Sequence, residues 1–229
     1  MSNHMEPSAR IYSRFNLNFY DFIVLVISNR FAWKCSTNGV LLPLFQQHIG
    51  ERAHLDVGVG TGYYVASSTI KLAKVENITL LDLNHNTLDS AASRLRRAGY
   101  KGNIDRVEQS VFSPLPDTLH GRFDAISLFY LFHCLPGAFP TKAEQVLDNL
   151  VPVLAPGGVL YGATILGTGV QHNWLGTRLM SLYNKKGIFT NKADSVENLE
   201  KALRSYFEDV KLRIVGKVAI FEARGPIRK

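Results

Sequence analysis

The stretch from Asp56 to Gly62, which reads DVGVGTG, decides the fold of this 229-residue chain. It closes a short apolar run, residues 53–57 (AHLDV), that is typical of a buried strand. The three glycines at alternate positions allow a tight turn and a close approach of a ligand to the backbone. Tyr63 stands where a dinucleotide fingerprint, G-x-G-x-x-G, has its third glycine. Asp56 would repel a phosphate, and it suits a cationic group instead.

Strand-like and helix-like patterns alternate after this turn. Strands are predicted at 53–57, 78–83, 104–109, 123–129, 159–165, 210–215 and 218–223, and helices at 63–74, 84–98, 141–154, 174–183 and 195–206. A turn is expected at 156–158, and Pro152 should kink or end the helix that contains it. Gly216 and Lys217 favour a tight hairpin between the last two strands. We therefore predict an α/β fold, with a Rossmann-like, doubly wound sheet of seven strands that is mostly parallel and ends in an antiparallel hairpin.

Composition excludes several classes of protein. Hydrophobic residues make up 46% of the chain and charged residues 20%, which is typical of a globular protein and not of a disordered one. Two cysteines, Cys35 and Cys134, cannot build a disulfide framework, and a cytoplasmic location is expected. The apolar run at 22–27 is too short to span a membrane. The net charge of +7 comes from scattered Lys and Arg, which favours a solvated basic surface over a nucleic-acid interface.

The glycine turn resembles motif I of the class I S-adenosylmethionine (SAM) methyltransferases, D-x-G-x-G-T-G, and the resemblance covers about residues 55–225. Asp82, at the end of the second predicted strand, and the run LAPGG at 154–158 strengthen it. The resemblance implies that SAM is the cofactor and that S-adenosylhomocysteine (SAH) is a product. It places Asp56 in the network around the ammonium end of the ligand, and Asp82 as the acceptor for both ribose hydroxyls. The other cofactor-binding residues that it implies are Gly58, Gly60, Gly62, Leu83, Ser110, Val111, Phe112 and Phe129.

The run after the third strand departs from the family pattern. An acid usually follows this strand and accepts a hydrogen bond from the adenine amino group, but Ser110 stands there. A serine hydroxyl or a backbone carbonyl would have to substitute, and Phe112 would stack on the base or cover it. No metal site is predicted, because His133 and Cys134 have no further ligands at a useful spacing.

The run after the fourth strand, residues 129–135 (FYLFHCL), bears on the substrate. It lacks the Asn/Asp-Pro-Pro-aromatic motif of enzymes that methylate the amines of nucleic-acid bases, and it is similar to the L-H-x-L stretch of small-molecule methyltransferases. His133 is either a general base or a structural imidazole that bonds a backbone carbonyl. Tyr20 and His172 are the other candidate catalytic residues, and His172 is otherwise an exposed loop histidine.

Two regions with aromatic residues flank the predicted sheet. They are residues 1–50 and the insert at 167–191, whose polar and aromatic side chains are expected to form the other wall of the substrate site. Residues 1–50 are expected to form an N-terminal helical lid or substrate segment, and residues 51–229 the SAM-binding methyltransferase domain; ordinary docking of the first region on the sheet is the alternative. Asp21 is either a polar anchor for the substrate or an ion-pair partner of Arg30. The candidate substrate-binding residues are Tyr12, Asp21, Trp33, Tyr130, Trp174 and Tyr183.

These features predict SAM-dependent methyl transfer to a carbon, nitrogen or oxygen of a small aromatic or natural-product acceptor. The runs around residues 20–33, 132–137 and 182–189 are similar to a group of small natural-product methyltransferases, some of which alkylate the C3 carbon of indoles. An RNA methyltransferase that uses the basic surface and a non-catalytic SAM-binding protein are the alternatives. No membrane partner and no metal are expected, nucleic acid is disfavoured as a partner, and a homodimer is compatible with the sequence.

Overall fold

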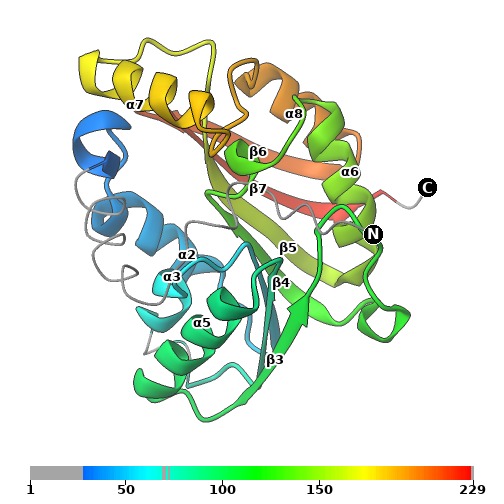
Figure 1. Ribbon diagram of the computed structural model, residues 1–229. Coiled ribbons are helices and arrows are strands. Elements are labelled where there is room, and N and C mark those ends of the chain that lie inside the picture. Colours follow the sequence, from blue (N-terminus) through cyan, green and yellow to red (C-terminus); the bar gives the residue numbers. More distant parts are fainter. Residues whose placement is uncertain (1–27, 69–70, 72, 228–229) are drawn as a thin grey trace, which may run out of the picture.

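The computed structural model describes residues 28–68, 71 and 73–227, and a central sheet organises them (Figure 1). The seven strands are β1 (Ala53–Val57), β2 (Asn77–Asp82), β3 (Asn103–Glu108), β4 (Phe123–Phe129), β5 (Leu154–Ile165), β6 (Phe207–Val215) and β7 (Val218–Pro226). They lie in the order β3-β2-β1-β4-β5-β7-β6. Strands β1 to β5 pair in parallel, whereas β7 is antiparallel to both of its neighbours. The predicted doubly wound sheet and its terminal hairpin are thus confirmed.

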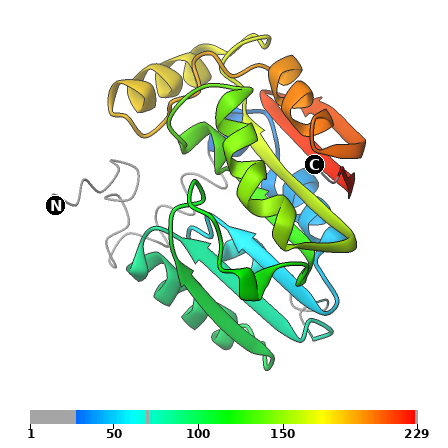
Figure 2. The ribbon, with the colours of Figure 1, turned by 90° about the vertical axis from the view of Figure 1, so that its right-hand side faces the viewer.

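Helices cover both faces of the sheet, and the sheet separates two hydrophobic cores. The α-helices are α2 (Leu42–His48), α3 (Tyr63–Ala66), α5 (His85–Arg97), α6 (Thr141–Leu150), α7 (Trp174–Lys185) and α8 (Val196–Arg204). Shorter helical turns are η3 (Thr37–Leu41), η4 (Asp117–Leu119), η5 (Phe132–Cys134) and η6 (Val151–Val153). Helices α6 and α8 pack on one face, and α2, α3 and α5 on the other (Figure 1). Helix α7 lies at one end of the sheet in both views (Figure 1, Figure 2).

Local chemistry explains where these helices begin and end. Asn84 caps α5, because its side chain accepts the N–H of Asn86 at 3.0 Å. Gly99 follows the same helix with a φ of +92°, which only glycine adopts without strain. Pro152 limits α6, which ends at Leu150 and continues only as the single turn η6, as predicted.

Two expected boundaries were wrong. The helix predicted at 63–74 is interrupted: α3 ends at Ala66, Ser67 and Ser68 are not helical, and Lys71 is helical again. The Ser68 hydroxyl donates to the Tyr64 carbonyl at 2.8 Å. Such a side-chain bond competes with continuation of the helix. The turn predicted at 156–158 lies within β5 instead, where the pairing with β4 shifts register between Phe123 and Ala125. This irregularity accommodates Gly157, whose φ is +76°.

The structure describes only part of the predicted N-terminal lid. Tyr12, Tyr20 and Asp21 lie outside the described residues, and the proposed boundary at residue 50 stays a prediction. The described part of this region docks on the sheet: Phe45 of α2 is fully buried, and its ring lies 5.3 Å from that of Phe129. Within the described part of the chain, no helix has the length and apolar character needed to cross a membrane.

Candidate cofactor and acceptor site

The glycine turn follows β1 at the carboxyl edge of the sheet. Gly58 donates its N–H to the Leu81 carbonyl at 2.8 Å, which ties the turn to β2. Gly58, Gly60 and Gly62 have φ angles of +70°, +50° and +68°, in the left-handed region. A Cβ on Gly58 would lie 2.7 Å from Leu131 Cδ1, so no larger residue fits there without a shift. The turn therefore has the backbone conformation that glycine favours, and its contact with a ligand stays a prediction.

Two carboxylates end the strands beside this turn. Asp56 lies on β1 and Asp82 at the end of β2, which is paired with it. Burial raises the pKa of Asp56 to about 7 and that of Asp82 to about 6. Backbone N–H groups, including that of Asn84 at 3.0 Å, act against this rise at Asp82. Among the described residues neither carboxylate forms an ion pair, so this pair of acceptors fits a ligand that brings an ammonium group and hydroxyls.

The residues expected to surround the adenine differ in their exposure to solvent. Leu83 is 41% exposed directly after β2, as a residue that borders a base should be. Ser110 Oγ accepts the N–H of the half-buried Phe112 at 3.2 Å, which leaves it one lone pair for another donor. Val111 and Phe129 are buried in the two cores, so a contact of their side chains with the cofactor stays a prediction.

Six residues from distant parts of the chain form an aromatic cluster near the carboxyl ends of β4 and β5. They are Trp33, Tyr130, His133, His172, Tyr183 and Phe189. Phe189 is central, since its ring centroid lies 4.5 Å from that of His133 and 4.8 Å from that of Tyr183. The structure thus brings together five residues that the sequence singled out one by one, and adds Phe189, which only belonged to a run expected to line the substrate.

The remaining members extend the cluster in two directions. Trp33 is 1% exposed and lies between Phe189, at 6.1 Å, and His172, at 6.0 Å, so it supports the cluster from behind. Tyr130 lies 5.4 Å from His133 and has a φ of +62°, which is rare for a residue with a side chain. Trp174 is not part of the cluster: it is 72% exposed, and Arg178 lies over its ring.

The two histidines of the cluster differ in which ring nitrogen is already hydrogen-bonded. The backbone N–H of Ile165 donates to Nδ1 of His133 at 3.3 Å, so the neutral ring holds its proton on Nε2. Burial, with the charge of Lys142, lowers the pKa of His133 to about 3, so the ring is neutral. This bond to an N–H replaces the expected bond to a backbone carbonyl. His133 therefore offers a donor rather than a basic nitrogen.

His172 is the same tautomer, but its other nitrogen is the one left free. Its Nε2 lies 3.0 Å from the Leu166 carbonyl, which can only accept, so the proton sits on Nε2. Nδ1 is left as a buried lone pair beside Gly176, without a hydrogen-bond partner. Burial also lowers the pKa of His172, which keeps this nitrogen unprotonated at neutral pH.

A buried ion pair supports the cluster from below. Lys142 Nζ lies 2.6 Å from Asp194 Oδ2, and the two side chains are 1% and 0% exposed. Asp194 Oδ1 also accepts the N–H of Phe139 at 3.3 Å. The pair thereby fixes the segment that carries Phe189 to the start of α6. Sequence reasoning missed it, although Lys142 occupies the same helical face as the buried Val146.

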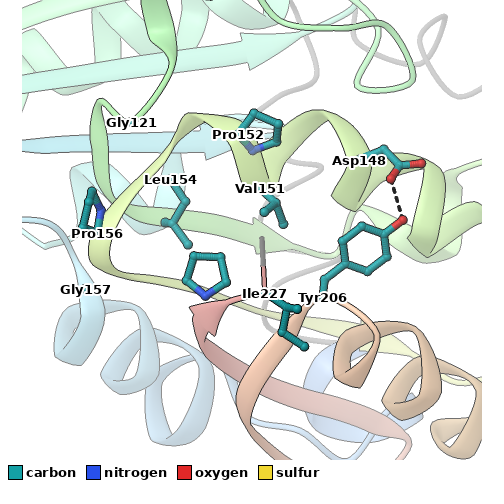
Figure 3. Close-up of a pocket in the computed structure, with 10 residues that line it drawn as sticks. Gly121, Asp148, Val151, Pro152, Leu154, Pro156, Gly157, Tyr206 and Ile227 are labelled. Carbon is teal, nitrogen blue, oxygen red and sulfur yellow. Dashed lines mark hydrogen bonds between the residues drawn. The ribbon is translucent and has the colours of Figure 1, made fainter. Parts of the chain in front are cut away.

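A cavity of about 720 Å³ lies elsewhere, at the amino ends of β4 and β5 (Figure 3). Its lining includes Val151, Leu154 and Ile227, and the Tyr206 hydroxyl bonds to Asp148 at 2.6 Å along one wall. Because β1 runs parallel to β4, this cavity is at the opposite edge of the sheet from the glycine turn, so it is not the cofactor site. No group of three or more metal-ligating side chains occurs in the described ranges.

A sheet of this order, with two acids and a glycine turn at the ends of β1 and β2, defines the class I SAM-dependent methyltransferases. The chain belongs to the methyltransferase family: a model described as "Methyltransferase domain" matches residues 55–160. Methyltransferase ctvB of Aspergillus terreus is 40% identical over 225 residues, which cover 97% of this chain and 96% of the relative. The physcion biosynthesis cluster O-methyltransferase of Aspergillus chevalieri is 38% identical over 221 residues, which cover 96% of each.

A solved structure shows the same fold. The DhpI–SAH complex superposes with a TM-score of 0.64 over the whole of both chains, at 17% sequence identity. These findings confirm that the protein is a SAM-dependent methyltransferase and that SAM is its cofactor.

Proposed function

We propose that this enzyme methylates a hydroxyl oxygen of a flat aromatic small molecule. The aromatic cluster at the carboxyl ends of β4 and β5 carries the proposal, because rings in edge and tilted contact offer apolar surfaces for a planar acceptor. The name of the Aspergillus chevalieri relative, an O-methyltransferase of a biosynthesis cluster, supports oxygen as the methylated atom. The similarity to indole C3-methyltransferases makes carbon the competing choice.

The cofactor half of the site binds and orients. SAM would supply a methyl group bonded to its sulfonium sulfur, and the protein has to align the acceptor with the carbon of that methyl group. Asp82 would hold the ribose hydroxyls and Asp56 the ammonium group, while the glycine turn allows close approach. Each of these contacts is made by a group that the backbone already fixes, which lowers the cost of ordering on binding.

The acceptor half supplies water exclusion and proton handling. His133 would donate from Nε2 to an oxygen of the acceptor and so orient it. We assign uptake of the hydroxyl proton to His172 Nδ1, because of the two histidines only this one has a lone pair without a hydrogen-bond partner. This nitrogen is buried, so the assignment requires that it becomes accessible when the acceptor binds.

The test is transfer of a carbon-13 methyl group from SAM to a panel of phenols and indoles, read by NMR. We expect label on oxygen, and label on a ring carbon or nitrogen would refute the choice of atom. His172→Gln can still donate to the Leu166 carbonyl but has no basic nitrogen. We expect kcat to fall about 100-fold in this variant. The loss should shrink toward pH 10, where a phenol loses its proton without help.

His133→Gln is the matched variant. Since His133 has no free basic nitrogen, we expect a higher KM for the acceptor and a pH profile like that of the wild type. A pH-independent loss in His172→Gln, or a shifted profile in His133→Gln, would reverse the two roles.

A further inference from the structure

A chain of buried polar side chains lies behind Asp56, on the side away from the glycine turn. His54 and Asp56 are two residues apart on β1, so they share one face of the sheet. Ser127 on β4 is the register partner of Asp56. His54 and Ser127 are fully buried, and Asp56 is 6% exposed. Polar groups at such positions replace apolar packing, and their hydrogen bonds have to account for their presence.

The direction of each bond in this chain follows from its first member. The backbone N–H of Gly50 points to His54 Nδ1 at 3.2 Å, and an N–H can only donate. His54 therefore carries its proton on Nε2, which lies 3.0 Å from Ser127 Oγ and donates to it. The Ser127 hydroxyl is then free to donate to Asp56 Oδ1, at 2.5 Å. The chain ends with a proton directed at the carboxylate.

The surroundings of Asp56 make this donor important. Asp82 faces it from β2, and Tyr161 from β5, next to Ser127 in register. Neither of these groups is positive, and both burial and Asp82 raise the pKa of Asp56. His54 is neutral, because burial lowers its pKa to about 3. The Ser127 hydroxyl is the side-chain contact that acts in the other direction, since it lowers the pKa of Asp56.

We propose that His54 and Ser127 are positioning residues that keep Asp56 ionised and correctly oriented for the ammonium group of the cofactor. Neither residue contacts the cofactor in this account. Both act through Asp56, so the inference rests on the assignment of that residue to the ammonium end. The effect of losing them should therefore depend on pH, which a purely structural role would not produce.

The experiment is calorimetric titration with SAH from pH 6 to pH 9. SAH keeps the amino group and the ribose but lacks the reactive sulfonium. Because all variants bind the same ligand, the ratio of each variant's Kd to that of the wild type removes the titration of the ligand itself. For Ser127→Ala we expect roughly tenfold weaker binding at pH 7, with the deficit shrinking as the pH rises and Asp56 ionises.

Three further variants sharpen the test. Ser127→Thr keeps the hydroxyl and should bind SAH like the wild type. His54→Leu removes the donor behind Ser127 and should show a smaller shift in the same direction. Thr79→Val removes another fully buried strand hydroxyl, which bonds to Asn77 on β2 at 3.1 Å, and should leave the ratio at one. Should Ser127→Ala not fold, Ser127→Cys, a weaker donor, is expected to show the pH-dependent loss.

A Kd ratio for Ser127→Ala that stays at one, or that is the same at every pH, would overturn the proposal. No acceptor takes part in this titration, so the result is independent of which molecule is methylated. Failure of the wild type itself to bind SAH would overturn the cofactor site and this inference with it.

Discussion

The proposed cofactor half and acceptor half of the site use different chemical groups. The cofactor half, formed by β1 to β3 with α3 and α5, uses backbone groups: the glycine turn and the N–H donors around Asp82. The acceptor half, formed by β4, β5, α7 and residues 186–195, uses side chains: the aromatic cluster and the ion pair of Lys142 with Asp194. The first arrangement suits one unchanging ligand. The second can change its acceptor through substitutions that leave the sheet intact.

The largest expected effect is on the free energy of unfolding, and it comes from a substitution in the acceptor half. Lys142→Ala leaves Asp194 buried without its partner, and we expect the free energy of unfolding to fall by about 3–5 kcal/mol. Denaturant titration measures this loss. The double variant Lys142→Met with Asp194→Leu should recover most of it, because no buried charge remains. If single and double variants were equally unstable, the ion pair would not be the cause.

The cofactor half should respond to pH instead. The pKa of Asp56 is raised to about 7 and that of Asp82 to about 6, from a model-compound value of 3.8. The folded protein therefore binds more protons than the unfolded chain between about pH 4 and pH 7, so the stability of the cofactor-free enzyme should fall as pH rises through this window. Denaturant titrations across this range measure it, and a flat profile in Asp56→Asn with Asp82→Asn identifies its source.

Removing one acceptor from the cofactor half should affect binding more than folding. Asp82→Ala takes away the carboxylate that we propose accepts the ribose hydroxyls, and we expect SAH to bind about 10- to 100-fold more weakly. Calorimetry gives the Kd, and circular dichroism checks the fold. A folded variant with wild-type affinity would refute the placement of the cofactor.

The smallest effect is expected outside both halves. Trp174 is 72% exposed and apart from the aromatic cluster, so Trp174→Ala should change the free energy of unfolding by less than about 0.5 kcal/mol. It should also leave the acceptor KM unchanged, in contrast to substitutions of Phe189. A raised KM in Trp174→Ala would return this residue to the substrate-binding set.

This contrast also explains what the sequence could reveal. The glycine turn, Asp56 and Asp82 are close in the chain and set by strand ends, so a short motif predicts them. The cluster needs Trp33, Phe189 and His133 to meet across more than 150 residues, and no local pattern encodes that meeting. Ser127 carried a usable signal, since a polar residue in the apolar strand FDAISLF calls for a partner.

The tautomers of the two histidines could not be predicted, because each depends on a single backbone group. The Ile165 N–H and the Leu166 carbonyl follow one another at the end of β5, and they bind Nδ1 of His133 and Nε2 of His172. Both rings therefore carry their proton on Nε2, but they leave opposite nitrogens free. The seven-stranded, doubly wound sheet with its terminal hairpin, by contrast, was predicted from the alternation of strand and helix patterns, although the order of its strands was not.

The most direct test of the account is transfer of labelled methyl groups from SAM to two acceptor pools, one of phenols and other small aromatic compounds and one of bulk RNA. We predict label in the small-molecule pool alone, because the aromatic cluster of the acceptor half is built for a planar organic acceptor. Label in RNA would contradict this and would make the net charge of +7 the decisive feature of the molecule.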